Sequence, residues 1–245
     1  MYFSATNIVH KFKTKRDFRN PFYYVCGMIE NINTALLLII IANVLVSIKG
    51  FSDAAFLDKF KFQVSKVLSG EKIRILTSGF LHVDWAHLGF NMYALYLFGG
   101  IVAGILGATS FLIIYFLSLL AGSLYALKFH KNESYYSAVG ASGAVSGIVY
   151  ASILLYPDMS LYLFFIPIPI PGYIFGVGYL LYSIYGMKKQ IGNVGHSAHL
   201  GGAIGGFAVT LLLNPSLFST NTFMVILLAV PIVLLLLFGD KLKSL

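Results

Sequence analysis

Long uncharged stretches dominate the chain, and short polar segments separate them. Stretches of this length and apolarity predict helices that cross a bilayer, whose hydrocarbon core needs roughly 20 apolar residues per span. The predicted spans cover about residues 33–48, 85–106, 108–127, 140–155, 172–185, 198–213 and 222–238. We therefore expect an all-α polytopic membrane protein with a bundle of six transmembrane helices, and residues 222–238 as a candidate seventh helix.

Two connecting segments depart from this pattern. Residues 50–84 mix lysines and an arginine with aromatic and aliphatic residues, which favours short helices lying in the membrane interface. The segment YPDMSLYLFFIPIPIPG carries three prolines at alternate positions, so it cannot form a straight helix. We expect it to be an interfacial connector.

The pattern divides the chain into a basic N-terminal segment (1–32), a membrane domain (33–214) and a C-terminal segment (215–245). Basic residues cluster before the first span: Lys11, Lys13, Lys15, Arg16 and Arg19. Beside a membrane span, such a cluster is typical of a cytoplasmic flank that faces anionic lipid. We expect a cytoplasmic N-terminus and a multi-pass protein of the cell membrane.

Composition excludes several classes of protein. Of 245 residues, 58% are hydrophobic and only 11% are charged, too few charges to cover a soluble domain of this length. The net charge of +8 comes from basic residues scattered over loops apart from the N-terminal cluster, so no nucleic-acid partner is expected. Cys26 is the only cysteine, which excludes an intrachain disulfide.

Six polar side chains gather at the starts of alternate spans: His82, His87, Asn91, Ser142, His196 and His199. The second, fourth and sixth spans run parallel, so these residues would lie at one depth, near the outer face. Polar groups inside spans cost free energy and usually mark function.

The residue types indicate nucleophilic catalysis. A serine hydroxyl becomes a nucleophile when a neutral histidine takes its proton, and the resulting oxyanion needs donors already in place. His87 and Asn91, one helical turn apart, can donate together with the Ser142 N–H. Ser146, a second serine, would lie about 6 Å deeper, where the sixth span offers no base. No acidic residue lies in the fourth or sixth span, which favours a Ser–His dyad. The chemistry does not choose between His196 and His199.

Small residues four apart favour close helix packing. Gly143 and Gly147 form such a pair in the fourth span, and Gly202 and Gly206 form one in the sixth.

The motifs HVDWAHLGFN, LFGG, GASG and AHLGG, in this order, resemble those of the rhomboid family of intramembrane serine proteases. The resemblance covers about residues 74–207. It implies a rhomboid-like helix bundle that cleaves transmembrane segments of other proteins within the bilayer, near their outer ends. It also implies that no metal or organic cofactor is used.

The resemblance assigns roles by position. It implies that Ser142 is the nucleophile and His199 the base, with the oxyanion hole formed by His87, Asn91 and the Ser142 amide. It implies supporting roles for a further set: His82, Arg74, Gly140, Gly143 and Gly202. Three positions depart from the family pattern. Ile73 stands where many members have the tryptophan of a Trp-Arg pair, and Ala103 stands where a glutamate is common. Ser146 stands where many members have an aromatic residue that stacks on the catalytic histidine.

Other functional hypotheses compete with that of a serine protease. Four histidines are candidate zinc ligands, although no carboxylate or cysteine accompanies them within the spans: His82, His87, His196 and His199. A catalytically inactive rhomboid-like protein that binds membrane proteins is the main alternative, and a transporter is a third class. His10 and His130 are expected to be solvated loop residues. The sequence leaves the oligomeric state unknown.

Overall fold

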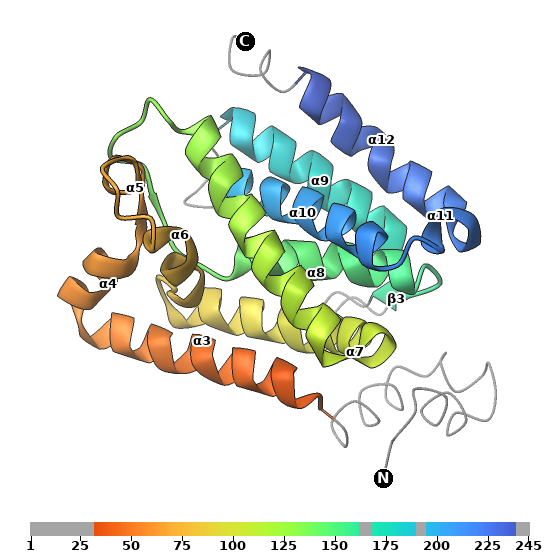
Figure 1. The fold of residues 1–245 in the computed structure, drawn as a ribbon, viewed down its shortest axis with the longest axis horizontal. Coiled ribbons are helices and arrows are strands. Elements are labelled where there is room, and N and C mark those ends of the chain that lie inside the picture. The colour runs from red at the N-terminus through yellow and green to blue at the C-terminus, as the bar shows by residue number, and fades with distance from the viewer. Residues whose placement is uncertain (1–31, 162–167, 190–194, 239–245) are drawn as a thin grey trace.

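A computed structural model describes residues 32–161, 168–189 and 195–238, and helices dominate them (Figure 1). The elements follow in the order α3 (Thr34–Ser52), α4 (Ala54–Phe60), β1 (Phe62–Gln63), α5 (Val64–Leu68), α6 (Arg74–Thr77), η2 (Ser78–Phe80), α7 (Trp85–Phe129), β2 (Ser137–Ala138), α8 (Ser142–Leu155), β3 (Ser160–Leu161), β4 (Ile170–Pro171), α9 (Gly172–Lys189), α10 (His196–Leu213), α11 (Leu217–Thr220) and α12 (Thr222–Phe238). The prediction of a helical fold is confirmed, while the number of helices that cross the membrane stays a prediction.

Three of these helices, α3, α7 and α10, are long and apolar enough to cross a membrane. Shorter apolar helices cover residues 142–155 and 222–234. The 45-residue α7 contains a kink at Gly107, where φ is 81°. This left-handed conformation suits glycine, which has no Cβ to clash. The two straight parts of α7, residues 85–106 and 108–129, correspond to two separate predicted spans.

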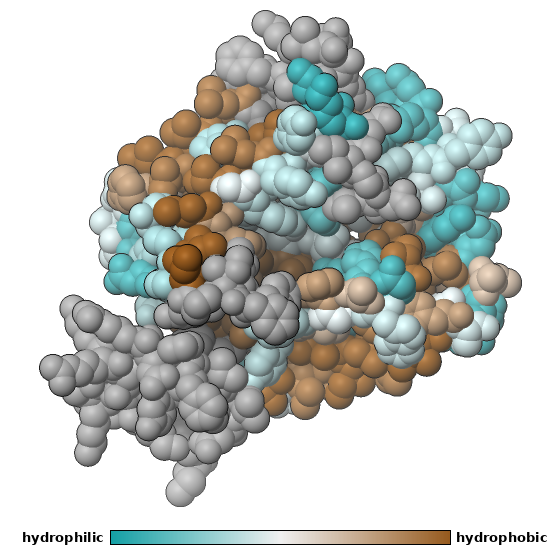
Figure 2. Space-filling model, turned by 180° about the vertical axis from the view of Figure 1, so that it is seen from behind, coloured by the Kyte–Doolittle hydropathy of each residue, from teal (hydrophilic) through white to brown (hydrophobic). Residues whose placement is uncertain are grey.

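Helix α8 lies at the centre of the bundle. Every residue from Gly143 to Leu154 is buried. Both parts of α7 and helix α10 pack around it, α3 follows the first part of α7, and α12 lies outermost beside α9 (Figure 1). The apolar surface at the lower edge of Figure 2 corresponds to α3, whose exposed side chains include Leu38 and Leu45.

Glycines allow α8 and α10 to touch through their backbones. A Cβ built on Gly202 would collide with the carbonyl of Gly143, and one on Gly206 would collide with the backbone of Gly147. The close approach expected from these two glycine pairs is therefore present.

The connectors combine short helices with short strand pairs. Residues 50–84 form the short helices that the sequence predicts, and β1 pairs antiparallel with β2 through Phe62 and Ala138. In the second connector, β3 pairs antiparallel with β4, so its described part is not helical. The basic cluster at 11–19, Cys26 and the centre of the proline-rich connector (162–167) lie outside the described residues.

Candidate active site

A tight turn before α8 brings Ser142 next to His87. Gly140 adopts φ 132°, and its N–H donates to the Ser78 carbonyl at 3.0 Å. A Cβ on Gly140 would lie 2.9 Å from His87 Nε2 and 3.7 Å from Ser142 Oγ. Residue 140 must therefore be glycine for both conformation and space, because a side chain there would meet both predicted catalytic groups.

The other predicted oxyanion donor lies one turn along α7. Asp84 caps this helix by accepting from the His87 N–H at 2.7 Å. Asn91 is buried, and its Nδ2 donates one hydrogen bond to the His87 carbonyl at 3.0 Å. Because a side-chain amide carries two N–H groups, one remains available for another acceptor. His87 and Asn91 thus share one face at the start of α7.

His82 links α3 to the turn that precedes Ser142. Ser47 Oγ donates to the Phe80 carbonyl at 3.0 Å and lies 2.8 Å from His82 Nδ1. A hydroxyl has one proton, so His82 Nδ1–H donates to Ser47, and Nε2 accepts from the Ala141 N–H at 3.4 Å. Burial lowers the pKa of His82 to about 3, and neighbouring His87 adds to this effect, so His82 is neutral near pH 7.

Helix α10 brings His199 to the same end of the bundle. The Ala198 carbonyl lies 3.3 Å from the position of a Cβ on Gly143, so the residue after Ser142 touches the residue before His199. Within the described residues, Ser142 Oγ and His199 make no hydrogen bond with each other. Catalytic hydrogen bonds are often long in unliganded enzymes, and the dyad stays a prediction.

The two histidines of α10 differ in accessibility. Their ring centroids are 6.1 Å apart with planes at 76°. His196 is only 3% exposed, packs edge-on against Tyr182 and contacts Gly186 of α9. His199 is partly exposed. This difference supports the choice of His199 as the base.

Arg74 stands apart from these residues. Its Nη1 donates to the Asp58 and Lys61 carbonyls at 2.7 and 3.0 Å, and its Nε donates to Glu71 at 2.7 Å. The Arg74 guanidinium holds the pKa of the Glu71 carboxyl below its usual range. Arg74 thus fixes the connector between α4 and α6 and does not touch the candidate dyad.

Sequence reasoning missed two residues that contact the site. Ser47 of α3 holds His82, and its position as a polar residue inside an apolar span was a signal that could have identified it. Tyr179 of α9 stacks on His199, with ring centroids 5.8 Å apart and planes at 20°. No motif marks Tyr179, because its pairing depends on how α9 and α10 pack.

The expectation that His130 is solvated was wrong. His130 is buried, stacks on Tyr136 at 3.5 Å between centroids, and lies 2.8 Å from Glu133 Oε2 through Nδ1. Its Nε2 lies 3.1 Å from Ser197 Oγ, beside the two histidines of α10. This network ties the end of α7 to the start of α10, where the sequence alone shows only a loop.

The zinc hypothesis requires several ligands around one point. Among residues 32–161, 168–189 and 195–238, no three His, Cys, Asp or Glu side chains are grouped so that they could hold a metal ion. The geometry gives zinc no support there.

Comparison with known proteins identifies the family. Residues 69–216 match the model of the rhomboid domain, which is more than half of the chain. The chain belongs to the rhomboid family. Family membership and the apolar helices together identify the chain as an integral, multi-pass membrane protein.

Three relatives illustrate the range of the match. The chain is 34% identical over 154 residues to "Rhomboid protein 1, mitochondrial" of Saccharomyces cerevisiae, covering 62% of this chain and 44% of that protein. It is 32% identical over 177 residues to "RHOMBOID-like protein 12, mitochondrial" of Arabidopsis thaliana, covering 66% and 52%. It is 35% identical over 145 residues to "Rhomboid protease GluP" of Bacillus subtilis, covering 58% and 26%. The match thus spans about half or less of each relative.

Proposed function

We propose that this protein is an intramembrane serine endopeptidase that cleaves transmembrane segments of other membrane proteins near the outer face of the membrane. The observation that carries the proposal is the turn at Gly140, where an added Cβ would lie within 4 Å of both the imidazole of His87 and the hydroxyl of Ser142. Family membership supports the reaction class.

In the proposed acylation step, Ser142 Oγ attacks the substrate carbonyl carbon while His199 takes the hydroxyl proton. The oxyanion accepts hydrogen bonds from the Ser142 N–H, His87 and Asn91. The Ser142 N–H is one of the first N–H groups of α8, which have no acceptor inside the helix. The C–N bond then breaks, and His199 returns the proton to the departing amine.

In the deacylation step, water is the nucleophile and Ser142 Oγ is the leaving group. A water molecule gives a proton to His199 as its oxygen attacks the acyl carbon, and the bond to Ser142 Oγ breaks as the proton returns to the serine. No metal or organic cofactor enters either step. A substrate helix must open locally for its carbonyl to reach Ser142, which glycine or proline in the substrate would ease.

The proposed location is the cell membrane, with the N-terminus cytoplasmic. Two of the relatives are named as mitochondrial proteins, so the location of this chain needs its own measurement. Single cysteines at Lys131 and Asp158, in a Cys26→Ala background, should react with an impermeant thiol reagent from opposite sides of intact cells. Labelling of both from one side would contradict the topology.

The test of the activity uses purified protein and a model transmembrane substrate in detergent. We expect cleavage by the wild type and none by Ser142→Ala. Ser146→Ala should retain most activity, because Ser146 is buried and its hydroxyl is hydrogen-bonded inside the bundle. A fluorophosphonate probe should modify Ser142 and leave Ser146 unlabelled. Absence of cleavage by the wild type, with the substrate still bound, would favour the inactive rhomboid-like binding protein instead.

A further inference from the structure

A column of three aromatic rings leads from α7 through α9 to His199. Phe98 stacks on Phe175 at 6.4 Å, and Phe175 stacks on Tyr179 at 6.1 Å, with planes within 16° and 14°. Tyr179 then stacks on His199 at 5.8 Å. Offset stacking at such distances is favourable and restricts how each ring can tilt. The imidazole of His199 is therefore held on one face by the phenol ring of Tyr179.

The hydroxyl of Tyr179 is tied to the helix that begins with Ser142. It lies 2.7 Å from Ser146 Oγ, and Ser146 donates its own proton to the Ser142 carbonyl at 2.7 Å. Since a serine hydroxyl has only one proton, Tyr179 donates to Ser146. A chain of two hydrogen bonds thus runs from Tyr179 to the backbone of the proposed nucleophile.

A second bond holds α9 against the same face of α8. The Tyr150 hydroxyl, one turn along α8 from Ser146, donates to the Gly176 carbonyl at 2.5 Å. Tyr150 is fully buried. Tyr179 is therefore fixed at its hydroxyl and through its helix, and its ring is not free to leave His199.

We propose that Tyr179 is the positioning residue for His199 and that it acts through its stacked ring, which the Tyr150–Gly176 bond keeps in place even without the Ser146 bond. This inference rests on the proposed function, because it assigns to Tyr179 the task of aiming the base. Position 146 carries a serine and no ring, and the ring that stacks on His199 comes from α9. When His199 takes the proton of Ser142, the face of the phenol ring also stabilises the imidazolium.

The experiment compares variants that remove the ring with variants that remove only the hydroxyl bond. Tyr179→Leu removes the planar ring, Tyr179→Phe keeps it, and Ser146→Ala removes the hydrogen-bond partner. Tyr185→Ala is the matched control, since Tyr185 is a tyrosine of the same helix that is 55% exposed. For each variant the measurements are kcat, KM, the rate of fluorophosphonate labelling at Ser142, and the melting temperature.

We expect Tyr179→Leu to lower kcat and the labelling rate by roughly ten- to thirtyfold, while KM changes less than about twofold. Tyr179→Phe and Ser146→Ala should stay within about threefold of the wild type, and Tyr185→Ala should match it. If Tyr179→Leu lowers the melting temperature markedly, Tyr179→Met replaces it, because a flexible side chain fills irregular space more easily.

Two results would overturn the proposal. One is a ring-free variant with wild-type kcat and labelling rate. The other is a Tyr179→Phe variant as impaired as Tyr179→Leu, which would assign the effect to the hydroxyl and not to the stacked ring. Failure of the proposed function looks different, because the wild type and Ser142→Ala would then behave alike in the cleavage assay.

Discussion

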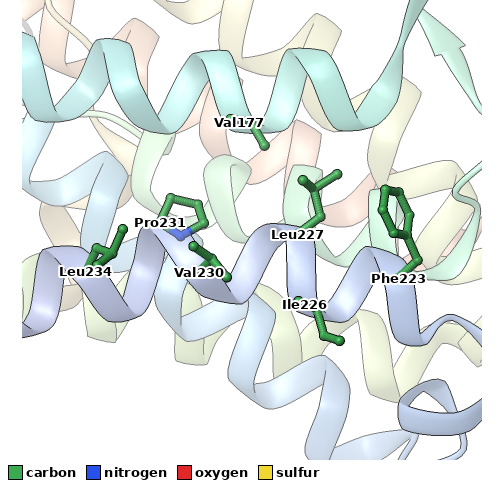
Figure 3. A pocket seen from close by; sticks show the side chains of 7 residues that line it. All are labelled: Val177, Phe223, Ile226, Leu227, Val230, Pro231 and Leu234. Carbon is green, nitrogen blue, oxygen red and sulfur yellow. The ribbon is translucent and has the colours of Figure 1, made fainter.

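Helices α8 and α10 meet through glycine backbones, whereas α9 and α12 meet through aliphatic side chains that leave a groove between them. The groove has a volume of about 390 Å³ and is lined by Val177, Phe223, Ile226, Leu227, Val230, Pro231 and Leu234 (Figure 3). At the α8–α10 contact, a single methyl group on Gly202 would strike a carbonyl. At the α9–α12 contact, an added Cβ on Gly176 would meet a side-chain carbon of Leu228 at 3.5 Å, an ordinary van der Waals distance.

The two helix contacts differ because only the α8–α10 contact has to bring the proposed catalytic side chains together. Two short side chains on different helices can meet only where the helices approach closely, and Ser142 and His199 start the two helices that do. Helix α12 carries none of the proposed catalytic groups. A groove lined by hydrocarbon costs little free energy inside a bilayer, because lipid chains are as apolar as the side chains. Tolerance to substitution should therefore fall from α12 towards α8.

The largest effect should come from the two histidines of α10. His199→Ala should abolish cleavage, a loss of about a thousandfold or more, because it removes the proposed general base. His196→Ala should only weaken it, because buried His196 packs against α9. The measurement is the initial rate of substrate cleavage by each variant, with melting temperatures recorded to confirm that both variants are equally folded. The reverse order would show that the roles assigned to the two histidines are exchanged.

The next effect concerns the glycine contact itself. Gly202→Ala should lower the free energy of unfolding by about 3 kcal/mol or more, at the upper end of overpacking costs, because the atom that the methyl meets is a backbone carbonyl and cannot move aside. Gly178→Ala on α9 is the control, since nothing lies within 4 Å of its Cβ position. Thermal unfolding in detergent measures both. Equal melting temperatures would mean that α8 and α10 are not in backbone contact.

The sequence predicted much of this inner region, for identifiable reasons. Long uncharged runs predict the helices, because a membrane span requires a minimum length of apolar residues. The motifs GASG and AHLGG are short and local in sequence, so they can be recognised on those helices without a structure. Tyr179 and the buried network of His130 were not predictable in the same way. Their roles depend on which helices pack against each other, and a tyrosine has the same local pattern whether it faces lipid or an imidazole.

A smaller effect should appear at acidic pH through His82. Its pKa is about 3 when folded and about 6.5 when unfolded, so the unfolded chain binds the proton more readily. The stability that neutral His82 provides is complete above about pH 6.5 and is lost as the pH falls towards 3. By pH 5 the loss should reach about 1–2 kcal/mol. His82→Gln should flatten the fall of the melting temperature between pH 7.5 and 5, and a fall as steep as that of the wild type would contradict this account.

The smallest effects on cleavage should come from substitutions on α12. Leu228 is fully buried and lies 3.5 Å from the Cβ position of Gly176 on α9, whereas Ile226 on the same helix is 56% exposed. Leu228→Ala removes packing against α9 and should cost about 1–3 kcal/mol, with cleavage within about twofold of the wild type. Ile226→Ala exchanges one apolar contact with the bilayer for another and should change neither stability nor cleavage. Melting temperatures and initial rates of the two variants, measured in one detergent, separate packing from catalysis. If Leu228→Ala reduced cleavage far more than twofold, α12 would belong to the scaffold that aligns Ser142 and His199, because the loss of a side chain on the outermost helix would then act on α8 through α9.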